Sequence, residues 1–136
     1  MRLPDKAAAR LALEAALERS LETMVNSARA TRSGVIHEDS RAEGDKDMRS
    51  TEQSYLARGQ AMRAEDIAEQ LQRLRATSFP AFDVDTPIAA GALMRVNIDD
   101  APRIFLLSPY GGGVALRVED VDLTVVTPSS PLGQAL

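Results

Sequence analysis

The chain has 136 residues, with 16 Lys and Arg against 20 Asp and Glu, and a formal net charge of −4 at pH 7. This length allows one compact domain, or a long helical element carrying a small domain, but not two full cores. With 26% charged and 44% hydrophobic residues, the chain is too apolar to be disordered throughout and too polar to span a membrane. The composition predicts a soluble folded protein.

Residues that the chain lacks exclude several kinds of chemistry. It contains no cysteine, which excludes disulfide scaffolds, thiolate zinc sites and cysteine nucleophiles and is compatible with a reducing cytosol. The N-terminal residues lack the apolar segment of an export signal, so we expect a cytoplasmic protein. His37 is the single histidine, which excludes a His-rich metal cage. We therefore expect no catalytic residues and no cofactor of the chain's own.

Charge and composition both change near Thr77. Residues 1–77 contain 13 Lys and Arg and 13 Asp and Glu, whereas residues 78–136 contain 3 and 7. Ala, Leu, Lys, Arg and Glu dominate the first part, and Val, Ile, Thr, Pro and Gly become frequent in the second. We expect two architectures, residues 1–77 and 87–136, joined by a linker over residues 78–86 with its hinge at Ser78 to Pro80.

The first part has the pattern of two helices. Asp5 is suited to cap a helix that runs from residue 5 to residue 33 or a little beyond, since Gly34 weakens continuation. A second periodic stretch predicts a helix over residues 50–76. Two such helices joined by a short segment bury their apolar stripes by folding back, which predicts an antiparallel coiled-coil hairpin. The expected stripes are Leu13, Leu17, Leu21, Met24 and Ala28 in the first helix and Tyr55, Leu56, Met62, Ile67, Leu71 and Leu74 in the second.

From Pro87 onward the apolar residues alternate with a period of two, which indicates strands. Turn residues separate these stretches at Asp99–Pro102, Pro109–Gly113 and Glu119-Asp120, and we interpret Gly111–Gly113 as a hairpin turn. The pattern predicts a small antiparallel sheet, so the fold class is α+β. About 50 residues barely make an independent core, so the base of the hairpin or a further element must cover the sheet. The expected strands contain Met94–Ile98, Ile104–Leu107, Val114–Val118 and Leu123–Val126.

The segment between the two predicted helices is rich in acids. Residues 37–47 include five carboxylates, and crowded carboxylates at a protruding end are suited to a hard cation such as Mg²⁺, which takes one or two of them and keeps several waters. The alternative is that the loop is simply acidic and solvated, and both interpretations stay open. The register of an EF-hand is absent. The five acids are Glu38, Asp39, Glu43, Asp45 and Asp47.

Two stretches of this sequence resemble the Gre-factor family, the bacterial transcript cleavage factors that bind RNA polymerase. The first, Arg49-Ser-Thr-Glu-Gln-Ser-Tyr-Leu-Ala-Arg-Gly-Gln60, is similar to the segment that opens the second helix in shorter members, where a polar acidic tip precedes it. The second, Val125-Val-Thr-Pro-Ser-Ser-Pro-Leu-Gly-Gln-Ala-Leu136, is similar to a segment of the family's C-terminal domain and is the more specific. With the helical pattern, the resemblance covers nearly the whole chain.

This resemblance implies a fold and a mode of action. The coiled coil would enter the secondary channel of RNA polymerase, and an FKBP-like β domain over residues 87–136 would dock at the channel rim. In cleavage-active members, acidic tip residues help to hold a catalytic Mg²⁺ of the polymerase and its water, so that the polymerase hydrolyses backtracked RNA. The resemblance therefore implies a factor that at most stimulates the polymerase's own nuclease activity, contacts nascent RNA indirectly, and binds no membrane.

The chain departs from the family pattern at the tip and at its end. Lys46-Asp47-Met48-Arg49 is one residue shorter than the Tyr-Asp-Thr-Arg-like segment of such members, with Asp47 the best match to the family aspartate and Asp45 the next. Glu43, Glu38 and Asp39 would support a negative tip. Relatives continue past the position of Leu136, so the domain is expected to be truncated, with an unpaired sheet edge that favours self-association.

Two alternatives stay open beside a cleavage factor. One is a channel-binding inhibitor that does not stimulate cleavage, and the other is a structural or adaptor coiled-coil protein unrelated to polymerase. Prolyl isomerase activity is not expected, because Phe105 and Tyr110 are the only aromatic residues after Phe82 and cannot line a proline pocket.

Overall fold

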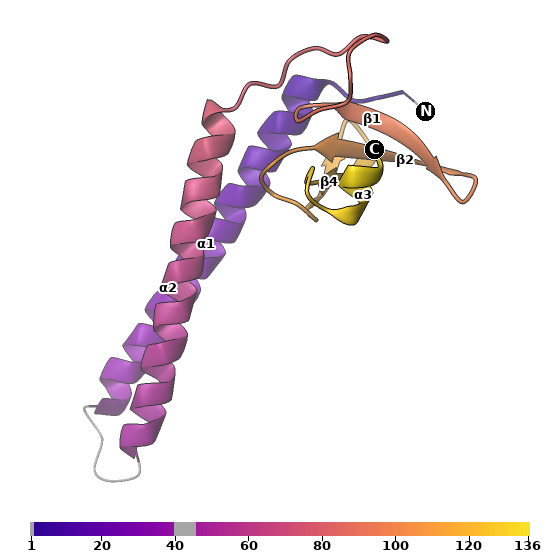
Figure 1. The fold of residues 1–136 in the computed structure, drawn as a ribbon. Coiled ribbons are helices and arrows are strands. Elements are labelled where there is room, and N and C mark those ends of the chain that lie inside the picture. Colours follow the sequence, from indigo (N-terminus) through magenta and orange to yellow (C-terminus); the bar gives the residue numbers. More distant parts are fainter. Residues whose placement is uncertain (1, 40–45) are drawn as a thin grey trace. The chain divides into compact units, whose positions relative to one another are not determined.

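The computed structural model describes residues 2–39 and 46–136, of which 35–39, 46–50 and 53 are described by their backbone alone. The fold is α+β, with two long helices followed by a four-stranded mixed sheet and a short helix (Figure 1). The chain forms two compact units, one of residues up to Leu17 together with Gln70–Leu136, the other of Glu18–Glu69. The elements are α1 (Lys6–Asp39), α2 (Lys46–Ala76), β1 (Leu93–Ile98), β2 (Ala101–Leu107), β3 (Ala115–Val118), β4 (Val121–Val126) and α3 (Pro131–Ala135).

The ends of the helices agree with the sequence patterns at two points and differ at two. Asp5 caps α1 as predicted, because its Oδ2 accepts a hydrogen bond of 3.0 Å from the backbone N–H of Ala8. α2 ends at Ala76, also as predicted. However, α1 continues past Gly34 to Asp39, since one glycine inside a long helix costs only about 1 kcal/mol. α2 begins at Lys46, four residues before the predicted start at residue 50.

The predicted apolar stripe is confirmed in α1, where Leu13 and Leu17 are buried and Leu21, Met24 and Ala28 are half-buried. In α2 the prediction is correct for Leu71 and Leu74, which are buried, and for Ile67, which is half-buried. It is wrong for Tyr55, Leu56 and Met62, which are exposed.

The buried stripe of α2 instead contains two alanines in the unit of residues 18–69. Ala57 and Ala64 are buried and lie seven residues apart, so they share one face of the helix. A search for large apolar residues misses this stripe because alanine is small and is common on every face of a helix.

The sheet has the order β1-β2-β4-β3, and β2 pairs with β4 in parallel. The expectation of a wholly antiparallel sheet is therefore wrong. The prediction of a hairpin turn at Gly111–Gly113 is wrong for the same reason, because β2 and β3 are not neighbours and β4 lies between them. A period of two identifies strands, but it carries no information about which strands pair.

The predicted turn at Glu119-Asp120 is confirmed as a two-residue hairpin turn. The predicted turn over Asp99–Pro102 is correct only for Asp99-Asp100, because Ala101 and Pro102 already belong to β2. Asp99 and Asp100 join β1 to β2 with φ values of 52° and 63°, and Glu119 and Asp120 join β3 to β4 with 51° and 63°. Two successive residues with positive φ match the right-handed twist of the strands that they join. The pairing of neighbouring strands thus follows from these short turns.

The first face of the sheet packs against the N-terminal part of α1 and the C-terminal part of α2, as expected for the base of the helices. Leu13, Leu74 and Leu106 are each 0% exposed at this contact. Gly111 is required here, because its φ is +80° and a β-carbon would lie 2.7 Å from Leu13 Cδ1. The buried set is Ala9, Leu13, Leu17, Leu71, Leu74, Ile104, Leu106, Leu116, Val118, Leu123 and Val125.

The second face of the sheet has a smaller cluster of buried residues: Ala92, Phe105, Leu107 and Val126. Phe82, from the connection before β1, and Leu132, from α3, pack against this cluster. Ser130 caps α3 by accepting a hydrogen bond of 3.0 Å from the backbone N–H of Gly133. The Thr127 carbonyl occupies the place that a β-carbon of residue 133 would need. The segment that carries the more specific family resemblance therefore has a structural role in covering this face.

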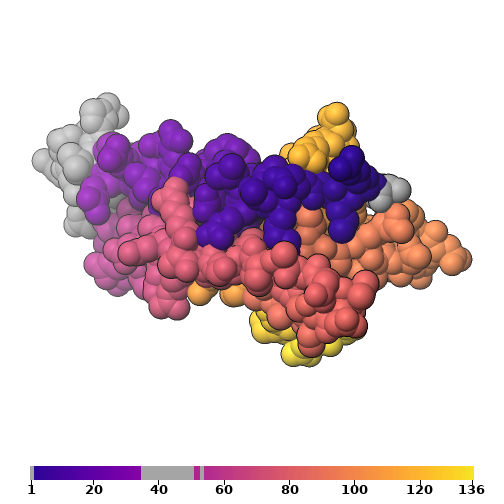
Figure 2. All heavy atoms as spheres, turned by 90° about the horizontal axis from the view of Figure 1, so that it is seen from above, coloured from indigo at the N-terminus to yellow at the C-terminus, as the bar shows by residue number. Residues whose placement is uncertain are grey.

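The connection between α2 and β1 has no regular secondary structure and lies at the surface, where Val84 is 99% exposed (Figure 2). It is nevertheless attached to α1, because Lys6 Nζ donates a hydrogen bond of 2.6 Å to the Pro80 carbonyl and lies 4.6 Å from the centre of the Phe82 ring. Further along, the Asp83 carboxylate accepts hydrogen bonds from the Thr86 hydroxyl and the Asp85 N–H, which lower the pKa of Asp83. The connection is therefore attached to α1 at Pro80, and its stretch from Asp83 to Thr86 is closed by hydrogen bonds within itself.

Candidate functional site

The acid-rich segment lies where α1 ends and α2 begins. Glu38 and Asp39 are the last two residues of α1, and Asp47 is the second residue of α2. Glu43 and Asp45 lie outside the described residues, and so do the side chains of the other three acids. The backbone thus places three of the five predicted carboxylates at the ends of helices of 34 and 31 residues. Which carboxylates come together stays a prediction.

The helix ends affect these acids differently. The C-terminal end of a helix carries a partial negative charge, so carboxylates there are unfavourable by about 0.3–1 kcal/mol each, whereas the N-terminal end favours them. Glu38 and Asp39 occupy the unfavourable end of α1, and Asp47 occupies the favourable end of α2. Helix stability therefore explains Asp47 but gives no reason for Glu38 and Asp39.

A polar contact joins the two helices within the unit of residues 18–69. The Thr31 Oγ1 lies 2.9 Å from the Ser27 carbonyl oxygen and 2.9 Å from Gln60 Oε1. A hydroxyl has one proton to donate, so both hydrogen bonds form together only when the Gln60 amide presents its NH₂ group to Thr31. This contact holds α1 beside α2 in the unit that carries the acidic segment (Figure 1).

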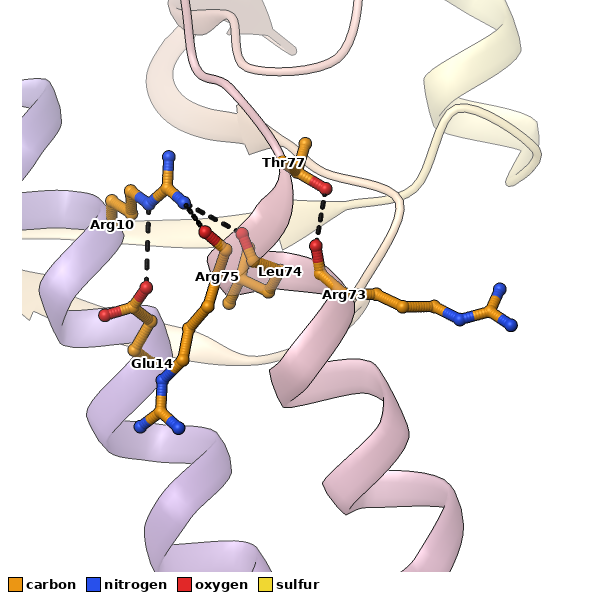
Figure 3. Close-up of polar contacts among 6 residues, drawn as sticks. All are labelled: Arg10, Glu14, Arg73, Leu74, Arg75 and Thr77. Atoms are coloured by element: carbon orange, nitrogen blue, oxygen red, sulfur yellow. Dashed lines mark hydrogen bonds and ion pairs between the residues drawn. The ribbon is translucent and has the colours of Figure 1, made fainter.

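At its other end, α2 is capped by side chains from outside its own sequence. Arg10 of α1 donates two hydrogen bonds through Nη2, of 2.9 Å to the Leu74 carbonyl and 3.0 Å to the Arg75 carbonyl (Figure 3). The Thr77 hydroxyl donates a hydrogen bond of 2.7 Å to the Arg73 carbonyl. The last carbonyls of a helix have no partner within it, so these contacts satisfy groups that would otherwise need water.

Arg10 is held in place by two further contacts. Its Nε lies 3.6 Å from Glu14 Oε1, and its guanidinium lies 5.0 Å from the centre of the Phe79 ring. Sequence reasoning missed this residue, because its partner carbonyls lie more than 60 residues along the chain and backbone groups leave no pattern. The sequence signal for this role is limited to the position of Arg10, a basic residue beside the apolar stripe of α1.

The side chains that the structure describes include no group of three His, Asp or Glu that could hold a metal ion. The five candidate acids are not among those side chains, so this observation concerns the rest of the chain. Within the described ranges, no helix is long and apolar enough to cross a membrane.

Comparisons with protein-family models, with curated proteins and with solved structures gave no match to this chain. The resemblance to Gre factors therefore depends on the sequence features quoted above. Its functional consequences are proposals.

Proposed function

We propose that this chain is a Gre-like regulator that binds bacterial RNA polymerase. In this proposal α1 and α2 form an antiparallel coiled-coil hairpin that enters the secondary channel, and the sheet belongs to an FKBP-like domain that docks at the channel rim. The observation that carries the proposal is that five acids are confined to residues 38–47, where two long helices end. At 1.5 Å per residue, α1 is about 50 Å long, which suits a finger that delivers a charged end to a distant site.

The distribution of charge over the helical part supports the same proposal. Residues 38–47 contain five acids against Arg41 and Lys46, whereas the rest of residues 1–77 contains 11 Lys and Arg and 8 Asp and Glu. The helical part thus has a negative end and is slightly positive elsewhere. The electrostatic field of a partner such as the polymerase can orient such a charge distribution as the two molecules approach. Such polarity has no evident use in a helical pair that serves only as a spacer.

The acids would act on a metal that belongs to the polymerase. Mg²⁺ typically keeps several waters and accepts one or two protein carboxylates beside the oxygens of its substrate. We assign Asp47 and Asp45 as the carboxylates that approach this metal, with Glu43, Glu38 and Asp39 increasing the local negative potential. The chain then needs no nucleophile or cofactor of its own, since the polymerase hydrolyses the backtracked RNA.

The test is a cleavage assay on stalled, backtracked elongation complexes, with binding to the polymerase measured in parallel. We expect the chain to stimulate removal of the RNA 3′ end. Asp47→Asn should reduce cleavage about 10- to 100-fold while leaving binding unchanged, because it removes a charge from the metal's surroundings and conserves size. Glu52→Gln is the matched control, since Glu52 is an exposed acid further along α2 and should be dispensable.

One observation favours a second candidate, a channel-binding inhibitor that does not stimulate cleavage. Asp47 lies within α2 rather than in the connection between the helices, and its segment is one residue shorter than the family pattern. A displacement of the carboxylate by only about 1 Å can lower the rate of cleavage by a large factor. Binding without cleavage would support this candidate, and the absence of both would contradict the proposal and favour an adaptor protein.

A further inference from the structure

The outer face of α2 in the unit of residues 18–69 exposes large apolar side chains. Tyr55 is 67% exposed and Met62 is 60% exposed. Their spacing of seven residues places them on one face of the helix, away from the face of the buried Ala57 and Ala64. Soluble helices normally place charged residues there, so this face is unusual in carrying an aromatic ring and a methionine.

Gly59 lies between these two residues, and no contact within the described structure explains why this position is a glycine. A β-carbon at this position would meet nothing within 4 Å. Glycine inside a helix costs about 1 kcal/mol relative to alanine, and here no neighbour in the described structure requires it. The face therefore has a shallow gap, in which the helix backbone is open to close approach, directly beside two exposed apolar side chains.

Charged residues of opposite sign flank this gap. Arg58 and Glu65 lie seven residues apart on the same side of the face, and both are exposed. The Arg58 guanidinium lies 5.9 Å from the centre of the Tyr55 ring. In the part of the chain that the structure describes, neither Arg58 nor Glu65 forms an ion pair. Both charges are thus available to a partner.

We propose that this face binds the same face of a second copy of the chain, with the two α2 helices antiparallel. A two-fold axis makes each contact occur twice. When Met62 of each copy lies over Gly59 of the other, Arg58 comes alongside Glu65 of the other copy. The flexible methionine fills the gap at glycine, and the opposite charges pair at its side.

The charges also decide the orientation of the pair. In a parallel arrangement in register, each residue lies beside its own counterpart, so Arg58 would meet Arg58 of the second copy and Glu65 would meet Glu65. Like charges that face each other oppose association, whereas the antiparallel arrangement pairs opposite charges at both sites. This pairing is derived from α2 alone and does not depend on the proposed function.

The first test is Gly59→Leu, measured by sedimentation equilibrium over a range of concentrations. The added side chain fills the gap and displaces Met62 of the second copy, so we expect dimerisation to weaken at least about tenfold, or 1.4 kcal/mol. Leucine favours the helix more than glycine does. A lost dimer together with an unchanged or higher melting temperature therefore cannot be attributed to unfolding.

The second test is a charge exchange. Arg58→Glu should weaken dimerisation about tenfold, and the double variant Arg58→Glu with Glu65→Arg should restore it. Leu11→Lys is the control, because Leu11 is 65% exposed on α1 and lies outside the proposed face. A wild-type chain that remains monomeric at about 1 mM would overturn the proposal. Equal dimerisation of Gly59→Leu, Arg58→Glu and wild type would also overturn it, and would indicate another surface such as a sheet edge.

Discussion

The two long helices have different surroundings in the two compact units. In the unit that contains the sheet, the helix residues Leu13 and Leu74 are 0% exposed, because sheet residues cover them. In the unit of residues 18–69, Leu21 and Met24 are only half-buried, although they continue the same stripe of α1. The large side chains of the stripe are therefore fully buried only where a further layer covers them. In the unit of residues 18–69 the buried side chains of α2 are the small Ala57 and Ala64.

The largest effect should come from removing a side chain of the covered stripe. Leu13→Ala should lower the free energy of unfolding by about 2–5 kcal/mol, because it removes buried surface and leaves a cavity. Leu21→Ala, at a half-buried position of the same helix, should cost much less. Urea unfolding of both variants checks the comparison, and equal losses would show that the two units do not differ in packing.

Two glycines should respond to alanine with opposite signs. Gly111→Ala should destabilise by about 1–3 kcal/mol, because its φ of +80° is strained for alanine and the new β-carbon would lie 2.7 Å from Leu13 Cδ1. Gly59→Ala should stabilise by up to about 1 kcal/mol, since space is open and alanine favours a helix. Thermal unfolding measures both changes. A shift of the same sign in both variants would contradict this account of the two sites.

Removing the cap of α2 should have an intermediate effect. Arg10→Ala should cost about 1–3 kcal/mol, because the carbonyls of Leu74 and Arg75 lose a charged donor. Arg10→Lys should recover part of this loss, since an ammonium keeps the charge but lacks the planar guanidinium fork. Hydrogen exchange of the last turn of α2 gives the local measurement, and unchanged protection in Arg10→Ala would exclude the capping role.

The sequence could predict several features that depend on residues close together in the chain. The N-cap at Asp5, the end of α2 and the turns at Asp99-Asp100 and Glu119-Asp120 are of this kind. Strand order could not be predicted, because the parallel pairing of β2 with β4 skips β3 and leaves no periodic signal. The stripe of α2 was misassigned at Tyr55 and Met62, since their exposure depends on which face of α2 meets α1.

For the candidate site, the sequence shows where the acids lie along the chain, but it did not predict that Glu38, Asp39 and Asp47 belong to the helices. The helical pattern stopped at Gly34, whereas α1 includes Glu38 and Asp39 in its last turn. The local cost of glycine is smaller than the gain from continuing a long helix, and this balance cannot be judged from one residue. The role of Arg10 required the three-dimensional structure, because its acceptors are backbone carbonyls of α2.

The smallest expected effect concerns the exposed connection before β1. Hydrogen bonds from the Thr86 hydroxyl and the Asp85 N–H lower the pKa of Asp83, so their stabilising contribution is present above the pKa of an unfolded Asp and is lost as the pH falls through the folded value. Thr86→Val should raise the pKa of Asp83 toward its ordinary value. A carboxyl NMR titration measures this, and an unchanged pKa in the variant would exclude the hydroxyl as the cause.

The central claim is that the acid-rich segment between α1 and α2 reaches the catalytic centre of RNA polymerase. Crosslinking tests this claim most directly. The chain has no cysteine, so Ser40→Cys introduces a single attachment point for a short photocrosslinker next to the acids. In a backtracked elongation complex we expect a crosslink to the extruded 3′ end of the RNA, and none from Val84→Cys, an exposed position in the other unit. Failure of Ser40→Cys to crosslink the RNA at saturating concentration, or equal crosslinking from both positions, would contradict the claim.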